Sequence, residues 1–213
     1  MKNFIIVLAL FLLSTQHAQA QVKAVTEEGD EVILFKDGTW KYTSDKKTAE
    51  IKLDTLYTKK AADATFLLKS KKIPCGVWLN PKKWKFEKDA NDTEPNEYSF
   101  TLNGEDVYAM FIPEKGQIPM DSWKAVAVEN AKSVAPDIEV VSEGIRNVNG
   151  IDVYCMQLNG TIKGIKFTYF GYYYSSDKGS AQFIAYTFQS LFKQYKPEME
   201  KLLNGFVQID ENL

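Results

Sequence analysis

Three turn dipeptides with glycine, each flanked by strand-like runs, constrain the fold of this chain more than any other feature. Asp37-Gly38, Asn103-Gly104 and Asn149-Gly150 contain residues that tolerate the positive φ angles of a type I′ hairpin turn. Strand-like runs rich in apolar, β-branched and aromatic residues flank them, as in Val107–Ile112 and Ile151–Leu158. We therefore expect a chain built mainly from antiparallel hairpins.

Further runs predict strands that pair with their neighbours in sequence. Thr65–Ser70 is expected to pair with Cys75–Leu79, and Ile165–Tyr174 with Ala181–Thr187. In the hairpin around Asn149-Gly150 the predicted register places three pairs of residues opposite one another: Ile145 and Tyr154, Glu143 and Met156, Val141 and Leu158.

Two segments have helical spacing. In Asp121–Val134 four apolar residues fall on one stripe, and Pro136 follows the end. A second stripe runs from Phe188 to Phe206, where Pro197 should kink the helix, break it or begin another one, and Gly205 could cap its end. A single helical turn is expected at Pro81–Trp84. The predicted fold class is α+β, an antiparallel sheet with helices packed on it.

The composition along the chain divides it into four parts. Residues 1–20 read as a signal peptide, because Lys2 precedes an apolar run and Ala18-Gln19-Ala20 forms a small-residue cleavage site. Residues 21–43 form a β-hairpin module, and Trp40 and Tyr42 share one face of a ribbon too small to bury them. Residues 44–60 read as a linker, and 61–213 as the main domain. The expected location is periplasmic or secreted, and no later segment is apolar enough to span a membrane.

The scarcity of certain side chains excludes several classes of function. The only histidine, His17, lies in the predicted leader, so histidine-dependent catalysis is excluded in the mature chain and no metal or other cofactor is expected. The chain has one arginine and a formal net charge of −2, which disfavours nucleic-acid binding. Cys75 and Cys155 are the only cysteines, and the sequence leaves open whether they form a disulfide.

Residues 61–210 resemble the PsbP-like fold, named after an extrinsic photosystem subunit. The similar pieces are the run Gly76–Trp84, in which a strand is followed by a Pro-x-x-Trp turn, the midway helix, and the closing run Leu202–Phe206. The resemblance implies an α-β-α sandwich and a non-enzymatic module that binds a protein partner or assists assembly. The run Val32–Tyr42 is similar to a hairpin of uncharacterised exported bacterial proteins.

The candidate binding residues are aromatic side chains and the single arginine. The run Tyr169–Tyr174 places aromatics on both faces of one strand, and Tyr169, Tyr172 and Tyr174 are candidates for a binding surface, with ordinary core packing as the alternative. Gly171 could admit a ligand or mark a bulge. Arg146 is a candidate for holding a carboxylate of a partner.

The sequence leaves three functions to be distinguished. The favoured one is an exported, soluble, non-catalytic binding or assembly module of the bacterial cell envelope, with an envelope protein as its partner. The alternatives are an envelope hydrolase that uses carboxylates and a carrier of a small ligand. A binding module would show an exposed aromatic patch, whereas an enzyme would show polar groups converging in a concave pocket.

Overall fold

A computed structural model describes residues 22–25, 31–35, 40–42, 52–89 and 95–209. The chain divides into two compact units, Met1–Thr48 and Ala49–Leu213. The predicted signal peptide, the Asp37-Gly38 turn and most of the acidic loop 89–97 lie outside the described residues.

The first unit contains the predicted three-stranded ribbon. Strands β1 (Val22–Val25), β2 (Glu31–Leu34) and β3 (Trp40–Tyr42) pair antiparallel in chain order. The side chains of Trp40 and Tyr42 lie outside the described part, so the expectation that they pack on a further surface remains a prediction.

The second unit is built on a large sheet with strand order β4-β10-β11-β12-β13-β9-β8-β7. Its strands are β4 (Lys52–Thr58), β7 (Trp84–Lys88), β8 (Tyr98–Leu102), β9 (Val107–Glu114), β10 (Glu139–Val148), β11 (Ile151–Ile162), β12 (Ile165–Ser176) and β13 (Gly179–Phe188). A small antiparallel sheet has the order β14-β6-β5, with β5 (Phe66–Lys69), β6 (Cys75–Leu79) and β14 (Phe206–Gln208).

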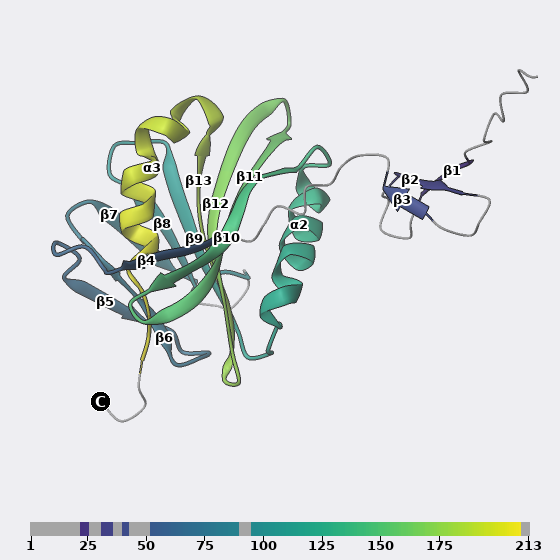
Figure 1. Cartoon of the computed structure of the whole chain (residues 1–213). Helices are drawn as coiled ribbons and strands as arrows, with labels where there is room; N and C mark the ends of the chain where they lie inside the picture. Colours follow the sequence, from purple (N-terminus) through teal and green to yellow (C-terminus); the bar gives the residue numbers. More distant parts are fainter. Residues whose placement is uncertain (1–21, 26–30, 36–39, 43–51, 90–94, 210–213) are drawn as a thin grey trace, which may run out of the picture. The chain divides into compact units, whose positions relative to one another are not determined.

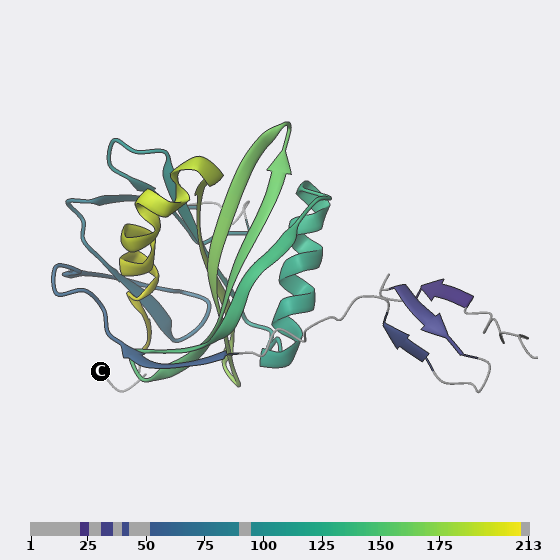
Figure 2. The same ribbon diagram turned by 45° about the horizontal axis from the view of Figure 1, so that its top comes forward.

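Helices cover both faces of the large sheet, which confirms the predicted α+β class. A short 3-10 turn, η1 (Met120–Ser122), leads into α2 (Trp123–Val134), and α3 (Gln189–Leu203) follows β13 directly. Figures 1 and 2 show α2 and α3 on opposite sides of the long strands β10–β13. The small sheet lies on the same side as α3, because both contribute to one buried cluster.

Strands β4 and β7 correct the sequence interpretation. Residues 52–58, expected to be part of a linker, pair parallel with β10, with Ile145 opposite Leu53. The segment contains few large apolar residues, and a parallel partner distant in sequence leaves no local signal. Pro81–Trp84 forms a turn capped by Asn80 and not a helix, because the alternating residues from Trp84 onward pair with β8 as strand β7.

The β10–β11 hairpin has the predicted register near its turn. Ile145 lies opposite Tyr154 and Glu143 opposite Met156, as expected, and Asn149 and Gly150 have the positive φ angles of the predicted turn. A register shift follows, so Leu158 lies opposite Val140 and not Val141. An extra residue in one strand leaves no pattern that distinguishes it from regular pairing.

Helix α3 continues through Pro197 and changes direction along its length (Figure 1). A kink was one of the three expected outcomes. Gly205 does not act as a left-handed cap, since it directly follows the C-cap Asn204 but does not have a positive φ. A Cβ atom at Gly205 would instead lie 1.9 Å from the carbonyl oxygen of Trp78, so the glycine permits close contact with β6.

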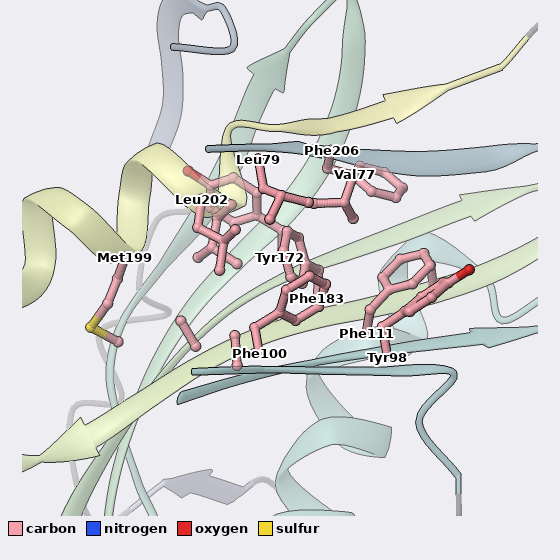
Figure 3. Packing of buried hydrophobic residues seen from close by; sticks show 14 of the residues in the cluster. Val77, Leu79, Tyr98, Phe100, Phe111, Tyr172, Phe183, Met199, Leu202 and Phe206 are labelled. Carbon is pink, nitrogen blue, oxygen red and sulfur yellow. The ribbon is translucent and has the colours of Figure 1, made fainter. Parts of the chain in front are cut away.

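Alternation along the strands divides the core of the second unit between the two faces of the large sheet. The face toward α3 and the small sheet buries Phe100, Phe111, Tyr172 and Phe183 with Leu202, as Figure 3 shows. The face toward α2 buries a second cluster, which contains Trp123, Ala127, Tyr154, Met156 and Tyr173. Each face therefore has its own helix and its own core.

Candidate binding site

Two of the predicted binding residues belong to the core. Tyr172 is 1% exposed and Tyr174 6% exposed. Tyr172 lies near Leu202 and Phe183 beneath α3 (Figure 3), and the ring of Tyr174 meets that of Phe206 edge-on at 5.2 Å. The interpretation of these two tyrosines as an open surface is therefore wrong, because the C-terminal helix and the small sheet of the same chain cover that face.

Arg146 does bind a carboxylate, but the carboxylate belongs to α3 of the same chain. Its Nη1 donates to Tyr172 Oη at 2.7 Å and lies 3.3 Å from Glu200 Oε1. Burial raises the pKa of Tyr172, so its hydroxyl stays protonated and donates to Asn204 Oδ1 at 2.8 Å. This network joins β10 and β12 to the C-terminal end of α3.

Tyr169 lies on the opposite face of β12, where it packs against the cluster under α2 and belongs to a group of partly buried aromatic side chains. It pairs across strands with Tyr186, which in turn pairs with Tyr108, and each neighbouring pair of ring centroids is 5.5 Å apart. The rings of Phe167 and Phe188 meet at 5.2 Å on the same face. We call these partly exposed side chains the aromatic patch: Tyr108, Phe167, Tyr169, Tyr186 and Phe188.

The aromatic patch combines apolar ring surface with accessible hydroxyl groups. Burial, followed by the neighbouring tyrosine, raises the pKa of both Tyr169 and Tyr186, so both hydroxyls are protonated at neutral pH. Neither hydroxyl bonds to a residue that the structure describes, and neither is among the fully buried polar atoms without a partner. Both therefore reach solvent. Such amphipathic rings are enriched at protein interfaces.

Sequence reasoning identified only Tyr169 of this patch. Tyr108 and Tyr186 lie in strands that were predicted as strands, but the order β12-β13-β9 brings them together and was not predicted. The sequence predicts the hairpin of Ile165–Tyr174 with Ala181–Thr187. The register of this hairpin could also have been predicted, and it would have paired Tyr186 with Tyr169. Tyr108 required the long-range pairing of β9 with β13.

Gly171 serves neither of the two purposes considered from the sequence. It lies in continuous register with Met156 and Ile184, so it marks no bulge. A Cβ atom at this position would lie about 3.0 Å from the ring and hydroxyl of Tyr173. The glycine therefore makes room for the Tyr173 side chain, which packs against Trp123 of α2.

The two cysteines are not joined by a disulfide. Cys75 lies in β6 and is fully buried, whereas Cys155 lies in β11 and is partly buried. Burial, with a smaller effect of Glu97, raises the pKa of the Cys75 thiol. The thiol is thus protonated at neutral pH and poorly suited to act as a nucleophile.

Among the described residues, no three histidine, cysteine or acidic side chains gather as they would around a metal ion. No helix in this part of the chain has the length and apolar character needed to cross a membrane.

No protein-family model matches the chain, and a search of curated proteins finds no similar sequence. Among solved structures, the chain is similar to the cyanobacterial PsbP protein CyanoP of Synechocystis sp. PCC 6803, with 13% identity, a TM-score of 0.49, and coverage of 70% of this chain and 94% of that one.

Two further solved structures are similar. A protein of unknown function from Pseudomonas aeruginosa, PA94, shares 11% identity with a TM-score of 0.44, covering 68% of this chain and 97% of that one. LpqN of Mycobacterium tuberculosis, which is involved in cell envelope biogenesis, shares 11% identity with a TM-score of 0.38, covering 72% of this chain and 82% of that one.

Proposed function

We propose that this chain is an exported, non-catalytic binding module of the bacterial cell envelope, and that its aromatic patch contacts a protein partner. The observation that supports the proposal most strongly is the patch itself. Five aromatic side chains share one face of three adjacent strands and remain partly exposed beside the area that α2 packs against. Fully buried aromatic anchors at the centre of an interface contribute most of its binding energy.

The buried carboxylates support a non-catalytic role over the hydrolase alternative. Glu143 accepts hydrogen bonds from Tyr154 and from Lys124 Nζ, the latter at 2.8 Å. Glu97 accepts from Ser70 Oγ at 2.6 Å and from the backbone N–H of Lys71 at 2.9 Å. Both groups therefore hold neighbouring elements in place, whereas a catalytic pair would face a common substrate position.

The packing between the large sheet and α3 supports binding at the surface over the carrier alternative. Tyr172, Phe183, Met199 and Leu202 fill this layer with buried side chains (Figure 3). A ligand carried within the sandwich would have to displace them. The proposed partner is therefore a protein that covers the aromatic patch from outside.

The test is site-specific photo-crosslinking in the producing bacterium. A benzoylphenylalanine at Tyr186 would lie in the centre of the patch, and the control at Lys85 would lie on the same sheet face, on the exposed edge strand β7. We expect a discrete crosslinked species at position 186 that is absent at position 85. Equal patterns at both positions, or no adduct at position 186, would contradict the proposal. Fractionation of the same cells tests export.

A further inference from the structure

A second surface feature is a hollow of about 540 Å³, which is lined by lysines from three segments of the chain. Lys71 and Lys72 lie in the turn after β5, Lys88 ends β7, and Lys115 follows β9. We call it the lysine cleft; its remaining lining residues are Asp89, Glu97, Pro113, Glu114 and Gly116. No residue of the aromatic patch contributes to it.

Glu97 is the buried acidic residue of the lysine cleft, and the protein itself already compensates its charge. The residue is 3% exposed. Its carboxylate accepts hydrogen bonds from the hydroxyl of Ser70 and the backbone N–H of Lys71, and Lys88 Nζ lies 3.8 Å away. Hydrogen bonds to a buried carboxylate offset its desolvation, so Glu97 leaves the other lysines of the cleft unneutralised.

Three of the four lysines have no such compensation. The ammonium groups of Lys71, Lys72 and Lys115 form no ion pair and donate no hydrogen bond to any residue within the described ranges. Like charges that gather around one hollow repel one another, and a multivalent anion removes this repulsion at several ammonium groups at once. The lining holds four lysines and three acidic residues, an excess of one positive charge, so an anion must be held through direct contact with the unpaired lysines and not through the field of the cleft as a whole.

We propose that the lysine cleft binds a small anion that carries two or more phosphate or carboxylate groups. The volume lies in the range of pockets that hold small molecules, about 300–1,000 Å³. The hydrogen bonds from the β5–β6 turn to Glu97 fix the backbone of Lys71 and Lys72 relative to the start of β8. The same phosphate chemistry is present in a free polyanion and in the headgroup of an anionic lipid.

The experiment measures binding of the purified chain to three probes. Pyrophosphate and citrate are titrated by calorimetry at physiological ionic strength, and vesicles of equal parts phosphatidylcholine and phosphatidylglycerol are tested by sedimentation. The cleft variant is Lys72→Gln with Lys115→Gln. The matched control is Lys82→Gln with Lys85→Gln, which removes the same charge from exposed positions outside the cleft.

We expect the cleft variant to weaken binding at least about tenfold, equivalent to about 1.4 kcal/mol, and the control to change it less than about twofold. Cleft-dependent binding of pyrophosphate or citrate identifies a free anion as the ligand, and cleft-dependent binding of vesicles alone identifies a lipid headgroup. The proposal is overturned if none of the probes binds, or if both variants weaken binding equally. A thermal melt of each variant confirms that the fold is retained.

Discussion

At the scale of single residues, contacts to the backbone determine which glycines matter. Gly205 lies where α3 passes into β14, and its N–H donates to Leu202 O while its carbonyl accepts from Trp78 N–H at 2.8 Å. A methyl group would overlap the Trp78 carbonyl, which belongs to a strand and cannot move away without breaking the small sheet.

We therefore expect Gly205→Ala to lower the free energy of unfolding by about 1–3 kcal/mol or more. Urea unfolding followed by circular dichroism measures the change. Gly116→Ala is the control, because a Cβ atom there meets nothing within 4 Å, and its effect should stay within about 0.5 kcal/mol. Equal stability of the two variants would contradict the prediction, because it would show that β6 moves to make room for the added methyl group without a loss of stability.

Two tyrosine hydroxyls allow a matched comparison between the two faces of the sheet. The hydroxyl of Tyr172 joins Arg146 to Asn204 in a buried site, whereas the hydroxyl of Tyr186 contacts solvent. Tyr172→Phe should cost about 1–3 kcal/mol, because Arg146 and Asn204 lose a hydrogen-bond partner in a site that is only partly open to water. Tyr186→Phe should cost less than about 0.5 kcal/mol. Denaturant unfolding of both variants under the same conditions measures the two losses in the free energy of unfolding. A larger loss for Tyr186→Phe would contradict the conclusion that the Tyr172 hydroxyl is buried and the Tyr186 hydroxyl contacts solvent.

At the scale of elements, local sequence was sufficient for most pairs of consecutive strands, and the pair β7–β8 is the exception. The hairpins β8–β9, β10–β11 and β12–β13 and the helix α2 were predicted from turn dipeptides and periodicity. The pairings of β9 with β13 and of β4 with β10 were not predictable, because they join segments far apart in sequence. The same limit applies to the candidate site. The sequence identified Tyr169 as a candidate binding residue, but it did not predict which face of β12 is covered by α3.

The contact between α3 and the turn before β7 makes a prediction about pH. Partial burial raises the pKa of Glu198, but hydrogen bonds from Lys201 and Lys83, at 2.7 and 2.9 Å, outweigh burial and lower it overall. A carboxyl group with a lowered pKa stabilises the fold above its unfolded pKa, and this contribution disappears as the pH falls through its folded pKa.

Glu198→Gln should therefore lower stability at neutral pH by less than about 1 kcal/mol, since the ion pairs remain partly exposed. The difference from the unchanged chain should shrink as the pH falls through the lowered pKa of Glu198, below which the carboxyl group is protonated in the folded and the unfolded chain. Urea unfolding over a series of pH values from neutral to acidic measures it. The control is Glu139→Gln, an exposed glutamate with no ion pair within the described ranges. A difference that persists in acid would show that the amide itself disturbs the packing.

At the scale of the whole molecule, the boundary of the second unit differs from the one that composition suggests. Low apolar content predicted a linker up to residue 60, yet the compact unit begins at Ala49 and includes β4. Lys52, Leu53 and Asp54 pair with consecutive residues of β10. A strand of this kind is stabilised by pairing with its partner strand and not by the apolar pattern of its own sequence. The edge of the large sheet therefore depends on residues that sequence composition assigns to a connection.

This boundary predicts different behaviour for two shortened chains. A chain of residues 49–213 retains β4, whereas a chain of residues 60–213 loses it and exposes the long strand β10 as a new sheet edge. The shorter chain also loses the Thr58 carbonyl, which accepts a hydrogen bond from the N–H of Asn149 at 2.8 Å.

We expect the melting temperature of the shorter chain to lie at least about 4 °C below that of the longer chain, the change produced by about 1–2 kcal/mol in a chain of this size. It should also aggregate more readily, because an unprotected edge strand can pair with another molecule. Calorimetry and light scattering at matched concentration test both effects. Identical melting and equal scattering would mean that β4 adds nothing to the sheet and that the true boundary is at residue 60.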